Sequence, residues 1–268
     1  MPRVQAGSLW LTYESTGDGP PLVLLPGLGM RIDQWAPYLP ALGAGRRVIA
    51  LDVRGGADSE SPPGPYSTRQ MAADTAQALD ELGVRRADIL GISMGGFIAQ
   101  WLALDHPARI RCLVLALTAL KPGARGRERL KLELKLREDP ALHELYFREL
   151  FLWLFDDATF ERNGAVDRLV EVALERSHEE QLEGVRGRVA ACLAHDASAW
   201  ASQIHVPTLV VGAKNDLVYP PRDAQALASA IPGAQLELID GAHALSGPAI
   251  RAFGEVVTRF LAAHLSGG

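Results

Sequence analysis

Cysteine is scarce in this chain, with two residues, Cys112 and Cys192, among 268. They lie far apart inside apolar runs, so no disulfide framework can be built on them. We expect both to be buried thiols. The seven histidines offer no pair with a spacing typical of a zinc site. The sequence therefore predicts neither a disulfide-stabilised protein nor a metal-dependent one.

Long hydrophobic runs are also missing. The longest uncharged apolar run, CLVLALTAL at residues 112–120, is too short to span a bilayer. The first ten residues, MPRVQAGSLW, lack the apolar core of a signal peptide. We therefore expect a cytoplasmic protein with no membrane partner.

An excess of positive charge is absent as well, because the formal net charge is -5 and the pI is about 5.8. Proteins that bind nucleic acid usually need clustered lysine and arginine. One basic stretch covers residues 121–138, but Glu128, Glu133 and Glu138 interrupt it. We interpret it as a solvated helix face and expect no nucleic-acid partner.

What the sequence does contain is a rhythm of short apolar runs and longer periodic segments, with 48% hydrophobic residues overall. Several of the runs are apolar on both faces, as a parallel sheet covered by helices requires. The candidate strands are residues 8–14, 21–26, 47–52, 87–92, 111–117, 208–213 and 235–240.

Helical patterns separate these strands. Ser67 and Gln70 form a possible capping box before an apolar helical face, and Gly83 follows as a C-cap. Strands that alternate with helices predict an α/β fold with a mostly parallel, doubly wound sheet. Residues 121–204 break the rhythm, with helix-like pieces and no convincing strand. We therefore predict a core of residues 1–120 and 205–268, with an α-helical insertion at 121–204.

The stretch GISMGG, residues 91–96, places a serine between glycines where an apolar strand gives way to a helix. It matches neither G-x-G-x-x-G nor the P-loop pattern, so a phosphate cradle is excluded. Gly91, Ser93 and Gly95 do match G-x-S-x-G, in which a sharp strand-to-helix turn exposes a serine nucleophile. Ser93 is therefore the candidate nucleophile, against the alternative of a merely structural turn.

A serine hydroxyl needs a base, and the base needs an orienting carboxylate, each placed just after a later strand. Asp216 follows the run TLVVGA, and His243 follows the run QLELID. Asp216 could instead be a turn residue, with Asp240 as a nearby competitor for the acid. His243 is the one histidine directly after the last strand, so we expect it to be the base.

Such a site also needs two N–H donors aimed at the developing oxyanion. The backbone of Met94, which follows the candidate nucleophile, can supply one donor. The loop PGLGM at residues 26–30 can supply a second, and Leu28 is the most plausible position. The alternative is that this loop is a plain turn.

The motifs PGLG, DVRGGADS, GISMGG, GAKND and GAH occur in this order, and together they resemble the α/β-hydrolase superfamily. The likeness is to its small esterases and lactonases, and residues 91–115 look like the corresponding stretch of 3-oxoadipate enol-lactonases. The resemblance implies a Ser93, Asp216 and His243 triad, no cofactor, and a helical cap at about 121–204. This sequence has Gly56 where many relatives have histidine, and Pro26 where many have histidine before the loop glycine.

The expected activity is cleavage of a small carboxylic ester or lactone through an acyl-enzyme. Phe151, Trp153 and Phe155 could line an apolar acyl site, although a helix packing on the core would use the same residues. Arg31 and Arg54 are candidates for binding a substrate carboxylate, or are ordinary surface cations. The alternatives are a perhydrolase or haloperoxidase-like activity, C–C bond hydrolysis, and a non-enzymatic ligand receptor. The sequence leaves the oligomeric state open.

Overall fold

The structure, a computed structural model, describes residues 1–177 and 181–265. Its centre is an eight-stranded sheet in the order β1-β2-β4-β3-β5-β6-β7-β8. The strands are β1 (Arg3–Ala6), β2 (Leu9–Thr16), β3 (Pro21–Leu25), β4 (Arg47–Leu51), β5 (Ala87–Ile92), β6 (Ile110–Ala116), β7 (Thr208–Ala213) and β8 (Gln235–Ile239).

The sheet is mostly parallel, as the sequence predicts. The pairs β3–β4, β3–β5, β5–β6, β6–β7 and β7–β8 are parallel, whereas β1–β2 and β2–β4 are antiparallel. The seven predicted strands are all present within one or two residues. The prediction missed β1, because its four residues, Arg3–Ala6, alternate polar and apolar at the edge of the sheet.

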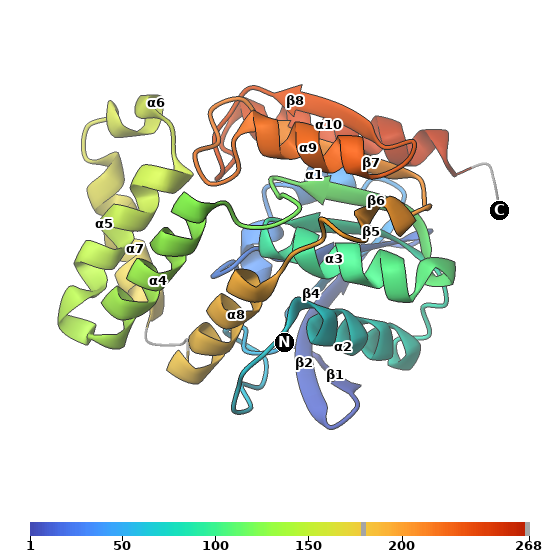
Figure 1. Ribbon diagram of the computed structural model, residues 1–268, viewed down its shortest axis with the longest axis horizontal. Helices are drawn as coiled ribbons and strands as arrows, with labels where there is room; N and C mark the ends of the chain where they lie inside the picture. The colour runs from blue at the N-terminus through green and yellow to red at the C-terminus, as the bar shows by residue number, and fades with distance from the viewer. Residues whose placement is uncertain (178–180, 266–268) are drawn as a thin grey trace.

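Helices cover both faces of this sheet (Figure 1). One face packs against α2 (Thr68–Glu81), α3 (Met94–Asp105) and α9 (Pro221–Ala230), and the other against α1 (Leu39–Leu42) and α10 (Pro248–Ala263). Val23 and Leu25 of β3 point to the first face, and Leu22 and Leu24 to the second. Successive side chains of this apolar strand point to opposite faces of the sheet. Both faces must therefore be apolar, because helices cover both of them.

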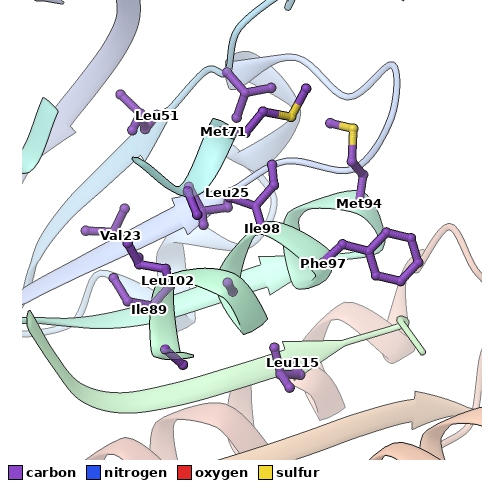
Figure 2. Packing of buried hydrophobic residues seen from close by; sticks show 14 of the residues in the cluster. Val23, Leu25, Leu51, Met71, Ile89, Met94, Phe97, Ile98, Leu102 and Leu115 are labelled. Carbon is purple, nitrogen blue, oxygen red and sulfur yellow. The ribbon is translucent and has the colours of Figure 1, made fainter. Parts of the chain in front are cut away.

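Helix α3 is the element that ties the core to the site. Ile98 and Leu102 of α3 lie beside side chains of β3 and β5, and Met94 and Phe97 of α3 belong to the same buried cluster (Figure 2). All four side chains are at most 1% exposed. Close packing of this kind fixes the start of α3, which is where the candidate nucleophile lies.

Between β6 and β7 the chain forms helices and, within its described residues, no strand. They are α4 (Ala124–Glu138), α5 (His143–Leu154), α6 (Asp157–Phe160), α7 (Ala165–Ser177) and α8 (Leu182–Ala194). Helices α4 to α7 form a lobe beside the sheet, and α8 lies between this lobe and the core (Figure 1). Residues 178–180 of the predicted insertion lie outside the described residues. Short 3-10 turns complete the described elements at Ile32–Trp35, Pro107–Arg109, Pro140–Leu142 and Ala201–Gln203.

Both thiols are buried, as predicted, and neither forms a disulfide. Burial raises the pKa of Cys112 and that of Cys192 to about 12. They are therefore packing residues rather than reactive ones. Among the described helices, none is both long and apolar enough to cross a membrane.

Candidate active site

The turn between β5 and α3 has the strained geometry of a nucleophile elbow. Ser93 has φ 54° and ψ -114°, a conformation that residues with a side chain rarely adopt. A Cβ on Gly91 would lie 2.2 Å from the carbonyl oxygen of Gly95, and one on Gly95 would lie 2.1 Å from the carbonyl oxygen of Leu25. The two glycines therefore allow the helix to start directly against the strand ends.

Three side chains from different loops meet at the carboxyl edge of the sheet. Nε2 of His243 lies 3.1 Å from Oγ of Ser93, and Nδ1 of His243 lies 2.8 Å from Oδ2 of Asp216. The elbow follows β5, the Asp216 loop follows β7 and the His243 loop follows β8. Because these strands are parallel in one sheet, with β6 between β5 and β7, their carboxyl ends bring residues 93, 216 and 243 to the same edge.

The carboxylate of Asp216 is buried and fully engaged. Its second oxygen, Oδ1, accepts hydrogen bonds from the backbone N–H groups of Val218 at 2.8 Å and Tyr219 at 2.9 Å. A carboxylate held in this way keeps one oxygen for Nδ1–H of His243, which leaves Nε2 free to accept a proton from Ser93. The competitor Asp240 has an 89% exposed side chain that pairs with Lys214, so it does not reach the histidine.

The loop at residues 26–30 passes beside the candidate nucleophile. A Cβ on Gly27 would lie 3.4 Å from Cβ of Ser93. The loop forms a tight turn, in which the N–H of Met30 donates to the carbonyl of Gly27 at 3.1 Å and Gly29 has φ +76°. Among the turn and loop hydrogen bonds of the described residues, none uses the N–H of Leu28.

Met94 is the first residue of α3, so its N–H has no partner inside the helix. Its side chain is 1% exposed within the core, which holds the backbone in place. The two backbone groups predicted as oxyanion donors, at Leu28 and Met94, therefore lie in elements that flank Ser93. Their role as oxyanion donors stays a prediction.

The aromatic residues predicted to line an acyl site pack mainly among other side chains. Phe151 is 8% exposed inside a cluster formed by α4, α5 and α7, and Phe155 packs against it with ring centroids 5.4 Å apart. Trp153 contacts the main core, and its Nε1 donates to Glu149 at 2.7 Å. The packing alternative that the sequence left open thus accounts for their burial.

The two arginines considered for substrate binding are each paired with a carboxylate of the core. Arg54 donates two hydrogen bonds to Asp74, both 2.8 Å long. Arg31 donates to Asp58 at 3.2 Å. These ion pairs give both guanidinium groups a structural role near the start of α2 and beside the loop at 26–30.

A small cavity lies against the 26–30 loop on the side of the helical lobe. Leu28 and Gly29 form one wall, and the charged residues Glu133, Arg137 and Arg188 contribute to the other. These three are not among the site residues predicted from the sequence, whose pattern at residues 121–138 indicates a solvated face. That interpretation is wrong for Glu133, which is 4% exposed and ion-paired with buried Arg129.

A signal for this cavity was present in the spacing. Glu133 and Arg137 stand three and seven residues after Leu130, on the same face of α4 as the apolar Leu134. Charged residues within an apolar helical stripe indicate a buried polar site.

Within residues 1–177 and 181–265, no three His, Cys, Asp or Glu side chains are grouped so that they could hold a metal ion. His178, one of the seven histidines considered, lies outside the described residues.

Comparison with known proteins places the chain among hydrolases. The family model described as the alpha/beta hydrolase fold matches residues 20–246. A protein of Azorhizobium caulinodans named "Putative carbamate hydrolase RutD" is 33% identical over 264 residues, covering 97% of this chain and 98% of the relative.

Lactonases are similar to this chain as well. The 3-oxoadipate enol-lactonase 2 of Acinetobacter baylyi is 28% identical over 252 residues, covering 92% of this chain and 91% of the relative. The crystal structure of the enol-lactonase from Burkholderia xenovorans LB400 superposes with a TM-score of 0.88 at 30% identity, covering 97% of this chain and 100% of that one.

Proposed function

Because the chain belongs to the α/β-hydrolase family and its relatives include proteins named as a putative carbamate hydrolase and an enol-lactonase, we propose that it cleaves a small carboxylic ester or lactone through an acyl-enzyme. The observation that carries the proposal is the hydrogen-bonded series Ser93, His243 and Asp216 at a strained turn. Elbow strain, a buried carboxylate and a correctly oriented imidazole occur together in few settings other than nucleophilic catalysis.

In the proposed mechanism, Oγ of Ser93 attacks the carbonyl carbon while Nε2 of His243 takes the hydroxyl proton. Asp216 holds the imidazole through Nδ1–H and stabilises the imidazolium. The N–H groups of Leu28 and Met94 donate to the oxyanion of the tetrahedral intermediate.

The C–O bond to the leaving group then breaks, and His243 returns the proton to the departing oxygen. Water, deprotonated by the same histidine, attacks the acyl-enzyme and releases the acid, so one ester and one water give one acid and one alcohol. The chemistry uses side chains and backbone groups of this chain alone. We treat the helical segment at 121–204 as the cap that covers this site.

The 33% identical relative named as a carbamate hydrolase favours a second substrate class. A carbamate presents the same kind of carbonyl carbon to Ser93, with nitrogen or oxygen as the leaving atom. The first substrate panel should therefore contain p-nitrophenyl esters, small lactones and simple carbamates, each assayed with and without hydrogen peroxide to detect peracid formation.

The proposal is tested by replacing the nucleophile. Ser93→Ala should lower kcat on the best ester by about 10⁶-fold without changing the melting temperature of the fold by more than a few degrees. A fluorophosphonate should label the wild-type protein at Ser93, as located by peptide mass spectrometry. Ser229→Ala, at an exposed position on α9, is the matched control and should retain both turnover and labelling.

Labelling at another residue, or ester turnover that survives in Ser93→Ala, would remove Ser93 from the mechanism. Stoichiometric binding of ligands without turnover in the wild-type protein would favour the receptor alternative instead.

A further inference from the structure

The chain turns sharply where β6 ends, directly beside the elbow at Ser93. Leu117 has φ +51°, and among the described residues it shares a positive φ with Ser93 as the two positions that are not glycine. This conformation is disfavoured for a residue with a side chain and persists where surrounding contacts hold it. The N–H of Leu117 donates to the carbonyl of Val211 in β7 at 2.8 Å. The strained turn directs the next residue, Thr118, toward the start of α3.

Thr118 is packed tightly against the first turn of α3. Its side chain is 1% exposed. A Cβ on Gly96 would lie 2.6 Å from Cγ2 and 2.7 Å from Oγ1 of Thr118, so glycine at position 96 is what permits this approach. Gly96 lies outside the G-x-S-x-G pattern, and the contact with Thr118 gives a physical reason for it. The carbonyl of the next residue, Ala119, accepts a hydrogen bond from Nε2 of Gln100 at 3.0 Å, which fixes the loop to the same helix.

The hydroxyl of Thr118 is bonded to the backbone of the candidate nucleophile. Oγ1 of Thr118 donates to the carbonyl oxygen of Ser93 at 2.8 Å. The same oxygen accepts the backbone N–H groups of Gly96 at 2.9 Å and Phe97 at 3.3 Å, which are the bonds that open helix α3. The bond from Thr118 is therefore additional to those that the helix needs.

This carbonyl belongs to the same peptide group as the N–H of Met94. The peptide group is planar, and in its trans form the C=O and the N–H point in opposite directions. The N–H of Met94 is the proposed oxyanion donor, and it has no partner inside the helix. Thr118 thus holds one end of the peptide whose other end would meet the oxyanion.

A donor at the carbonyl changes the N–H at the far end of the peptide in two ways. It draws electron density away from the amide nitrogen, and hydrogen bonds connected in series strengthen one another by about 10–30% per bond. It also fixes the plane of the peptide, so the N–H needs no reorientation when negative charge develops on the substrate oxygen. Both effects favour the tetrahedral intermediate over the bound substrate.

We propose that Thr118 is a positioning residue of the oxyanion hole, which orients and polarises the Ser93–Met94 peptide through its hydroxyl. The inference rests on the proposed hydrolysis at Ser93 and adds to it a residue that touches neither the substrate nor the other two members of the triad.

The kinetic test removes the hydroxyl and keeps the shape of the side chain. Thr118→Val should lower kcat and kcat/KM on the best p-nitrophenyl ester by about tenfold, with KM within about twofold of the wild-type value. This loss is smaller than the 10²–10³-fold cost of removing an oxyanion donor, because the N–H of Met94 remains present. The rate constant for fluorophosphonate labelling of Ser93 should fall by a similar factor.

Two further variants separate the hydroxyl from packing. Thr118→Ser keeps the hydroxyl and loses a methyl group, so its rates should stay within about threefold of wild type. Thr75→Val is the matched control, because Thr75 is also 1% exposed and its Oγ1 also donates to a backbone carbonyl, that of Met71, at 2.8 Å. That bond lies within α2, away from the peptide of Met94, so Thr75→Val should leave the rates within about twofold of wild type.

The state of the Met94 amide is observed directly by NMR spectroscopy on protein labelled with [¹⁵N]methionine. The chain has four methionines, and Met1 carries an amino group, so Met30, Met71 and Met94 are the expected backbone amide signals. Met94→Leu identifies the third. In Thr118→Val the nitrogen signal of Met94 should move upfield, because the carbonyl before it loses a donor. The signal should stay in place in Thr118→Ser and Thr75→Val.

The outcomes separate this inference from the proposed function. An unmoved Met94 signal in Thr118→Val, equal rate losses in Thr118→Val and Thr75→Val, or a Thr118→Ser enzyme as slow as Thr118→Val would overturn the role of the hydroxyl and leave hydrolysis at Ser93 standing. If the wild-type protein hydrolyses no ester and Ser93 is not labelled, the proposed hydrolysis is the part that fails. The Met94 signal then decides alone whether Thr118 polarises the peptide.

Discussion

The position of one carboxylate decides how the imidazole at this site is oriented. Asp216 is buried, accepts two backbone N–H groups and lies 2.8 Å from Nδ1 of His243, whereas Asp240 is exposed and pairs with Lys214. The two aspartates stand in neighbouring loops and could not be ranked with certainty from spacing alone. The burial and the partners of the two side chains show that Asp216, and not Asp240, contacts the imidazole.

We predict that Asp216→Asn lowers kcat by about 10⁴-fold, because an amide can present its NH₂ to Nδ1 and stabilise the wrong tautomer of His243. Asp240→Asn should change kcat by less than about twofold. Steady-state rates on a p-nitrophenyl ester, measured on variants with native-like melting curves, provide the check. A large loss in Asp240→Asn with little change in Asp216→Asn would mean that the acid lies one loop later.

At the scale of elements, α8 is the helix of the 121–204 segment that packs most closely on the core. A Cβ on Gly187 would lie 2.2 Å from the ring of Tyr66, and one on Gly184 would lie 2.4 Å from the carbonyl oxygen of Gly55. Val185 and Val189 of the same helix belong to the main hydrophobic core. The glycines let α8 approach the loop after β4, and this approach places Arg188 at the cavity.

We predict that Gly187→Ala destabilises the protein by about 1–3 kcal/mol, because the buried Tyr66 ring must move. Gly126→Ala in α4 is the matched control, since its Cβ would meet no closer atom than Cβ of Pro122 at 3.9 Å. That substitution should stabilise by about 0.5–1 kcal/mol through helix propensity. Urea unfolding of the three proteins measures both changes. Equal stabilisation by both substitutions would mean that α8 does not pack against Tyr66.

At the scale of the whole molecule, one buried histidine links stability to pH. His195 is 3% exposed, stacks on Phe97 with ring centroids 4.1 Å apart, and its Nδ1 lies 2.9 Å from Oγ1 of Thr68. Burial lowers the pKa of His195 to about 3 from 6.5. Between about pH 3 and pH 6.5, His195 is protonated in the unfolded chain and neutral in the folded chain. The contribution of His195 to the free energy of unfolding is therefore fully present above pH 6.5 and is lost as the pH falls through this range.

We predict that the free energy of unfolding of the wild-type protein falls by about 1 kcal/mol more than that of His195→Gln between pH 6 and pH 5. The variant will itself be less stable at pH 7, because glutamine cannot reproduce the ring stacking. The quantity to compare is therefore how steeply the free energy of unfolding of each protein changes with pH, which is obtained from urea unfolding at each pH. Parallel profiles for the two proteins would show that His195 takes up a proton in the folded state.

The helices between β6 and β7 contribute to two different hydrophobic clusters. Helices α4, α5 and α7 share a cluster of their own that includes Leu136, Phe147 and Val170, whereas α8 packs into the main core. The Ala244 N–H donates to the carbonyl of Leu154 at 2.8 Å, so the end of α5 is fixed beside the His243 loop. The predicted insertion thus contains a helical lobe and a further helix, α8, that packs both on the core and against α4.

The sequence by itself determined the sheet and the candidate triad, because both rest on local signals. Apolar runs of strand length alternate with helical patterns, and Ser93, Asp216 and His243 each stand a few residues after such a run. A parallel sheet brings the ends of those strands to one edge whatever the details of packing. Among the strands of residues 1–177 and 181–265, β1 alone was not predicted, since four residues of mixed polarity at an edge carry too weak a pattern.

The tertiary structure alone decided which charges are buried. Glu133 and Arg188 are buried and Arg137 is partly buried. They come from two helices separated by more than forty residues, and they meet only when α4 and α8 pack together over the 26–30 loop. Likewise, Phe151 could serve either a pocket or a core, and its neighbours in the helical lobe place it in a core. Burial depends on what other parts of the chain cover a residue, and local sequence does not contain that information.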